Sequence, residues 1–189
     1  MYFSGMAATS SMMPLGTKMP EFALYDVLCE GIVSLPDKPA VATVVAFICN
    51  HCPYVHHIIS EFVRFAHLAQ KSGIRVIAVC SNDSVQYPDD SPEKMKEFAT
   101  AHGFRFPYLV DESQAVARAF QAECTPDLYI FDAENRCVYR GRFDASTPGN
   151  GMPVTGADMY DAISSLLNGQ PVSGDQFPSI GCSIKWKSR

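Results

Sequence analysis

Two cysteines, Cys49 and Cys52, stand where a strand pattern ends and a helix pattern begins. Residues 41–48 form an almost unbroken apolar run rich in β-branched side chains, which is typical of a buried central strand. Pro53 fits the first turn of a helix, because its missing N–H has no intrahelical partner to lose. Cysteines beside a helix N-terminus are favoured as thiolates by the helix dipole. The junction therefore predicts a redox-active dithiol or a metal site, and we favour the dithiol.

The residues after this junction complete a strand–helix–strand unit. Apolar residues recur at helical spacing over residues 55–69, and Gly73 stands where a helix C-terminus is expected. Residues 75–80 predict a second strand, which the crossover helix makes parallel to the first. Ser91 followed by Pro92 predicts the N-cap and first residue of a further, inserted helix.

The remaining patterns add two hairpins and a final helix. Residues 21–27 and 32–35 predict an N-terminal β-hairpin, and residues 128–132 and 137–142 predict a second, antiparallel pair. A last helix is expected over residues 157–167. Together these elements predict an α/β fold with a central mixed sheet of four or five strands and helices on both faces.

Length and composition describe one globular domain. The chain has 189 residues, of which 47% are hydrophobic and 19% charged. We expect residues 1–18 to form a loosely ordered lead-in and residues 19–189 to form a single domain. The net charge of −5 gives no electrostatic basis for binding nucleic acid or an anionic membrane surface. No apolar run approaches the ~20 residues of a transmembrane helix.

Cysteine usage favours a reducing compartment. The chain has seven cysteines, and its first residues lack the basic segment of a secretory signal. An odd number of cysteines without an export signal argues against a secreted fold held together by disulfides. We therefore predict a cytoplasmic protein.

A second motif, together with the two cysteines, resembles the thioredoxin-like superfamily. Cys124, Thr125 and Pro126 directly precede the first strand of the second hairpin, as in that fold. The N-terminal hairpin and the inserted helix resemble its redoxin branch, the alkyl hydroperoxide reductase and thiol-specific antioxidant family. Residues 48–54 and 181–187 are similar to a bacterial subgroup of that branch. The resemblance implies a thioredoxin-like fold and a thiol–disulfide oxidoreductase that needs no cofactor.

The resemblance also implies roles for individual residues. Cys49 would be the exposed nucleophile, and Cys52 would resolve the mixed disulfide. His51 would stabilise the Cys49 thiolate. Pro126 would follow a cis peptide bond and leave the backbone of Thr125 free to pair with an extended substrate strand. The residues expected to position the substrate are His51, Pro53, Thr125 and Pro126.

The resemblance implies a protein disulfide, a small-molecule disulfide or a peroxide as the substrate. The electron donor would be a thiol such as thioredoxin, glutaredoxin or glutathione. The particular substrate and donor, the direction of electron flow and the oligomeric state stay open, with a homodimer among the alternatives. The role of the tail that contains Cys182 also stays open. The tail either brings a third redox-active thiol to the site or forms a packed cap over an edge of the core, and we favour the cap.

Three other functions remain as alternatives. Peroxiredoxins belong to the same branch, but in them a threonine stands three positions before the nucleophilic cysteine. Here Ala46 stands at that position before Cys49. Alternatively, Cys49 and Cys52 with His56 or His57 would offer thiolate and imidazole ligands to zinc or Cu(I). A second pair of closely spaced cysteines is lacking, so we expect no metal. The third alternative is a binding module that keeps the fold without turnover.

Overall fold

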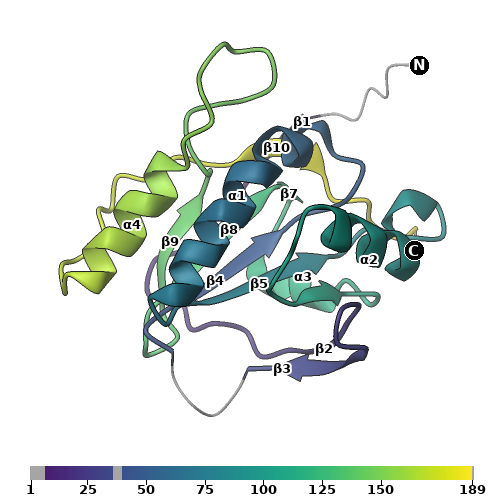
Figure 1. Ribbon diagram of the computed structural model, residues 1–189, viewed down its shortest axis with the longest axis horizontal. Helices are drawn as coiled ribbons and strands as arrows, with labels where there is room; N and C mark the ends of the chain where they lie inside the picture. The colour runs from purple at the N-terminus through teal and green to yellow at the C-terminus, as the bar shows by residue number, and fades with distance from the viewer. Residues whose placement is uncertain (1–6, 36–39, 189) are drawn as a thin grey trace.

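The computed structural model describes residues 7–35 and 40–188. Its main sheet is built from β2 (Ala23–Asp26), β3 (Gly31–Ser34), β4 (Thr43–Phe47), β5 (Arg75–Cys80), β6 (Tyr108–Val110), β8 (Asp127–Phe131) and β9 (Cys137–Gly141). The strand order is β3-β2-β6-β5-β4-β8-β9, with parallel and antiparallel neighbours (Figure 1). The predicted mixed α/β sheet is confirmed. It has seven strands instead of four or five, because the N-terminal hairpin joins it through pairing of β2 with β6.

The predicted strand–helix–strand unit is confirmed. β4 and β5 are parallel neighbours, connected by α1 (Pro53–Lys71), and Cys52 is the N-cap of that helix. The inserted helix α2 (Pro92–Ala101) connects β5 to β6. Its N-cap is Ser91, whose side chain accepts a hydrogen bond from the Lys94 N–H at 3.4 Å. The loop that carries Cys49 and Cys52 therefore lies at the carboxyl end of β4, next to the parallel strand β5.

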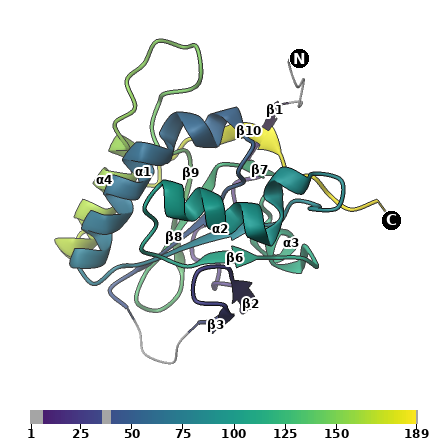
Figure 2. The same ribbon diagram turned by 45° about the vertical axis from the view of Figure 1, so that its right-hand side comes forward.

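Helices cover both faces of the main sheet (Figure 1 and Figure 2). α1, α2 and α4 (Ala157–Leu167) pack on one face, and α3 (Ala115–Phe120) packs on the other. Side chains of β4 point alternately to the two faces of the sheet. Val44 therefore packs in the core on the face of α1, α2 and α4, and Val45 packs in the core on the face of α3. None of the described helices is long and apolar enough to cross a membrane.

A small second sheet brings an N-terminal and a C-terminal strand to the segment that contains Cys124 and Thr125. It contains β1 (Ala7–Thr9), β10 (Ile180–Ser183) and β7 (Cys124–Thr125), in the order β1-β10-β7 with antiparallel pairing. The sequence did not predict this sheet. From β1 onward, the segment expected as a loose lead-in is held in the fold, since β1 pairs with β10 and Met13 is fully buried. Residues 1–6 lie outside the described residues.

Gly181 allows β10 to approach β7 closely. A Cβ atom at Gly181 would lie 2.0 Å from the Thr125 carbonyl oxygen, closer than any side chain tolerates. We expect Gly181→Ala to lower the free energy of unfolding by about 2 kcal/mol or more, the cost of an overpacked core. Urea denaturation measures this change. Gly174→Ala, where a Cβ would meet no atom within 4 Å, is the matched control. Equal losses in the two variants would contradict the close packing of β10.

Candidate active site

The structure brings the two predicted cysteines together in the loop between β4 and α1. Cys49 follows the end of β4, Cys52 caps α1, and Pro53 is the first helical residue. The Cys49 and Cys52 thiols are close enough to shift each other's pKa. Because Cys52 stands at the helix N-terminus, the helix dipole favours negative charge there.

Thr125 contacts both cysteines. Its hydroxyl Oγ1 lies 3.3 Å from Cys49 Sγ, and its carbonyl oxygen accepts a hydrogen bond from Cys52 Sγ at 3.1 Å. The peptide bond between Thr125 and Pro126 is cis, as predicted. The second motif of the sequence therefore lies directly against the first, although more than seventy residues separate them.

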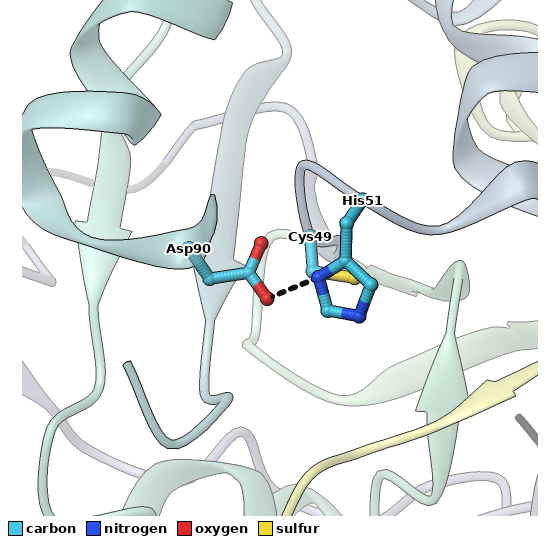
Figure 3. Close-up of side chains that lie close together, drawn as sticks. All are labelled: Cys49, His51 and Asp90. Atoms are coloured by element: carbon cyan, nitrogen blue, oxygen red, sulfur yellow. Dashed lines mark ion pairs between the residues drawn. The ribbon is translucent and has the colours of Figure 1, made fainter. Parts of the chain in front are cut away.

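Both cysteines are buried, which corrects the expectation that Cys49 is exposed. The exposed fraction is 1% for Cys49 and 0% for Cys52. Thr125 lies against both sulfurs, and the His51 ring lies beside the Cys49 sulfur (Figure 3). A substrate disulfide can therefore reach either sulfur only when part of this cover moves.

The backbone edge of Thr125 is occupied, which corrects a second expectation. Thr125 was expected to pair with an extended substrate, but it pairs in register with Cys182 of the chain's own strand β10. The physical reason is the glycine at position 181, which lets β10 lie against the Thr125 carbonyl. An extended substrate strand would have to displace β10 from this edge.

Asp90 was not among the residues predicted from the sequence, although it organises the loop that carries the cysteines. Its carboxylate is 2% exposed and accepts hydrogen bonds at 2.7 Å from the Asn50 backbone N–H and from the Asn82 side chain. It also forms an ion pair with His51, in which Asp90 Oδ2 lies 2.8 Å from His51 Nδ1 (Figure 3). A single buried carboxylate thus fixes both residues between the two cysteines.

The sequence did contain a signal for Asp90. The carboxyl ends of adjacent parallel strands meet at one edge of a sheet, and ligand-binding residues gather there. Residues 81–90, which follow β5, are rich in polar side chains and end on Asp90. They could have been expected beside the residues that follow β4.

The pKa shifts of this cluster favour negative charge on Cys52. The neighbouring thiols of Cys182 and Cys49 lower the pKa of Cys52. The neighbouring Cys52 and burial raise the pKa of Cys49, while the ion pair with Asp90 raises the pKa of His51. These directions favour charge on Cys52, whereas the sequence predicts charge on Cys49.

Comparison with known protein families matches the AhpC/TSA family over residues 15–140, more than half of the chain. The chain belongs to the AhpC/TSA family. This membership confirms the predicted redoxin branch and supports a redox function in general.

Solved structures share the fold of this AhpC/TSA protein. An uncharacterized conserved protein from Geobacillus kaustophilus is 53% identical, with a TM-score of 0.95 and 97% of each chain covered. A hypothetical protein from Sinorhizobium meliloti 1021 is 42% identical, with a TM-score of 0.93 over 96% of this chain and 99% of that one. A thiol:disulfide interchange protein of the thioredoxin family from Chlorobium tepidum TLS is 17% identical, with a TM-score of 0.62 over 82% and 99%. The last likeness concerns the fold alone, and it confirms the predicted thioredoxin-like architecture. None of the curated proteins compared matches the chain.

Among the described residues, one group of side chains in this AhpC/TSA protein is arranged to hold a metal ion. Ligand atoms of Cys49, His51 and Asp90 all lie within 4.8 Å of one another. His56 and His57, the imidazoles considered from the sequence, are not part of this group. Because the Asp90 carboxylate already accepts two amide hydrogen bonds, we interpret the group as a polar cluster that orients the loop.

Two hollows flank the dithiol loop of the AhpC/TSA protein. The first, of about 230 Å³, lies beside Pro126 and is also lined by Tyr54 and Ile180. The second, of about 430 Å³, lies beside His51 and is also lined by Phe98. Both adjoin the loop without being lined by Thr125.

Asp127, directly after Pro126, gives the stability of this AhpC/TSA protein a pH dependence. Burial raises the pKa of its carboxyl to about 8, and Asp127 Oδ2 accepts a hydrogen bond from the Tyr129 hydroxyl at 3.1 Å. The folded chain therefore binds this proton more tightly than the unfolded chain. The free energy of unfolding should fall as the pH rises from about 4 to about 8.

Asp127→Asn should remove this part of the pH dependence, because the amide stays neutral. Urea denaturation at about pH 5 and about pH 9 measures it. Asp175→Asn, at an exposed position, is the matched control and should keep the pH dependence of the unmodified chain. An unchanged profile in Asp127→Asn would show that the carboxyl is already ionised in the folded state at low pH.

Proposed function

We propose that this AhpC/TSA protein is a thiol–disulfide oxidoreductase that uses Cys49 and Cys52 as its dithiol. The observation that carries the proposal is the contact of Thr125 with both sulfurs, beside the N-terminus of α1. A buried pair of reduced cysteines without a redox role has no need of this charge-stabilising position. The polar cluster around Asp90 adds a fixed loop geometry, which an exchange reaction requires.

The charge distribution suggests the order of the reaction. The Cys52 thiolate attacks one sulfur of the substrate disulfide, and the other substrate sulfur leaves and takes up a proton. Cys49 then loses its proton and attacks Cys52 Sγ. The Cys49–Cys52 bond forms as the bond between Cys52 and the substrate breaks, and the second substrate thiol is released. The dithiol is oxidised by two electrons, and the substrate is reduced by two.

The imidazole of His51 supports the second step. A His51 nitrogen lies within 4.8 Å of Cys49 Sγ, and the ion pair with Asp90 raises its pKa. A protonated ring there stabilises the thiolate that forms on Cys49 when it gives up its proton. An external thiol, such as thioredoxin, glutaredoxin or glutathione, would return the oxidised pair to the dithiol.

The occupied edge of Thr125 favours substrates that insert a compact group. A small-molecule disulfide, or a disulfide on a protruding loop, can lie in the hollow beside Pro126, whereas an extended strand would compete with β10. We therefore propose compact disulfides as the first substrates to examine. Oxidised glutathione is the simplest probe.

Equilibration with glutathione buffers of defined ratio tests the proposal. We expect two thiols per chain to be lost together, with a potential between roughly −230 and −120 mV, the span from glutaredoxins to strong oxidants. Mass spectrometry after alkylation should locate the lost thiols at the dithiol. The absence of any disulfide involving Cys49 and Cys52 across this range would refute the function. Rapid consumption of hydrogen peroxide with a thiol donor would instead support the peroxidase alternative.

A further inference from the structure

We propose that Cys182 is a third redox-active thiol of this site, which forms a disulfide with Cys52 in exchange with the Cys49–Cys52 disulfide. The inference rests on the proposed function of the dithiol and extends it to the C-terminal strand. It replaces the favoured expectation that the tail is only a packed cap.

Three observations place Cys182 at the dithiol. Cys182 belongs to the same buried cluster as Cys49 and Cys52. The pairing of β10 with β7 sets Cys182 opposite Thr125, the residue that contacts both other cysteines. The thiols of Cys182 and Cys52 are also close enough to shift each other's pKa. The Cys52 sulfur therefore has two neighbouring thiols as candidate disulfide partners.

The tail that carries Cys182 is held in place by contacts outside this cluster. The Lys185 N–H donates to Asn82 Oδ1 at 2.8 Å, and the Gln114 side chain donates to the Lys185 carbonyl at 2.9 Å. The Arg118 guanidinium lies 4.3 Å from the centre of the Trp186 ring. Fixing the strand in this way gives Cys182 a high effective concentration at Cys52, which favours exchange within the chain.

The exchange itself needs no external oxidant. Cys182 loses its proton and its sulfur attacks Cys52 Sγ of the Cys49–Cys52 disulfide. The Cys52–Cys182 bond forms, the Cys49–Cys52 bond breaks, and Cys49 leaves as a thiolate that takes up a proton. The number of disulfides is unchanged, so the oxidised chain exists as two isomers.

This exchange gives the thiol donor access to the oxidised site. Cys182 is 9% exposed, against 1% for Cys49 and 0% for Cys52. A donor thiolate can reach Cys182 Sγ with a smaller movement of the surrounding structure than an attack on Cys49 or Cys52 would require. Cys52 then leaves as a thiolate, which its neighbours stabilise. A second donor thiol releases the first one from Cys182, which completes the reduction.

A variant that lacks Cys29 and Cys49 tests the Cys52–Cys182 disulfide. Cys29 is exposed and is replaced by serine to prevent disulfides between chains. Trypsin cleaves after lysine and arginine except before proline, so the Lys38–Pro39 bond stays intact. Cys52 is then the one cysteine of residues 19–64, and Cys182 is the one cysteine of residues 143–185. After oxidation with diamide, we expect these two peptides to be joined by a disulfide, and the thiols of the chain to fall from five to three.

Matched variants separate this disulfide from other events. Adding Cys182→Ser should abolish the joined peptide, whereas adding Cys124→Ser should keep it. Cys124 is also buried beside Thr125, but its thiol contacts the carbonyl oxygens of Pro126 and Ser179. Circular dichroism confirms that each variant is folded. A folded Cys29→Ser/Cys49→Ser protein whose residues 143–185 stay unlinked would overturn the proposal.

The same oxidation of Cys29→Ser/Cys182→Ser distinguishes the two proposals. A Cys49–Cys52 disulfide in this variant supports the proposed function independently of Cys182. If that disulfide forms and the joined peptide does not, the third thiol alone is refuted. If the joined peptide forms without a Cys49–Cys52 disulfide in this variant, the proposed dithiol is refuted and the Cys182 pairing is supported.

Discussion

Cys52→Ser is expected to lower the rate of disulfide reduction by at least about 1000-fold, because it removes the sulfur on which negative charge is stabilised. The remaining thiols cannot take its place, because Cys49 and Cys182 both have raised pKa values, for which the neighbouring Cys52 is the first cause. Initial rates of oxidised glutathione reduction, measured with an excess of thiol donor, provide the test. Cys137→Ser is the control, since its buried thiol contacts the Tyr139 carbonyl and lies outside the cluster.

Trapping experiments reveal which sulfur attacks. We expect Cys52→Ser to accumulate no mixed disulfide with glutathione. The double variant Cys49→Ser/Cys182→Ser should accumulate one on Cys52, because both thiols that can resolve it are absent. A mixed disulfide on Cys49 in Cys52→Ser would instead support the order implied by the family resemblance, with Cys49 as nucleophile and Cys52 as the resolving thiol.

The parts of the fold that the sequence predicted well are those with a strong local pattern. The β-branched run of β4, the helical spacing of α1 and the Ser91-Pro92 start of α2 each determine one element from neighbouring residues. The pairing of β10 with β7 has no such pattern, since both strands are short and lie far apart along the chain. The pairing of β2 with β6, which enlarges the sheet, is likewise non-local.

The same distinction holds at the site. Cys49, Cys52 and Pro126 were identified because each belongs to a short motif with a chemical meaning. The burial of Cys49 and the charge preference of Cys52 depend on what distant segments place around them, above all Asp90 and Cys182. A motif can therefore predict which residues react, whereas predicting which cysteine attacks first requires the packing around the motif.

Asp90→Ala should lower the free energy of unfolding by about 3 kcal/mol, because it leaves the Asn50 N–H and the Asn82 amide without their buried acceptor. The matched control is Asp89→Ala. Asp89 is the exposed neighbour, and its contribution to the loop is a backbone carbonyl that accepts from the Asn50 side chain, which alanine retains. Urea denaturation of both variants measures the difference. Equal stability of the two would show that water or another group replaces the Asp90 carboxylate.

Asp90→Asn isolates the electrostatic part of this effect at nearly constant volume. The ion pair with Asp90 raises the pKa of His51 in the folded chain, so its contribution to stability is complete below about pH 6.5 and is lost as the pH rises through the folded pKa. The asparagine variant should lower the His51 pKa measured by NMR and remove this pH-dependent contribution. It should also slow the resolution step, in which the His51 charge stabilises the Cys49 thiolate. If the His51 pKa stayed unchanged while activity fell, Asp90 would act by fixing the loop and not by raising the pKa of His51.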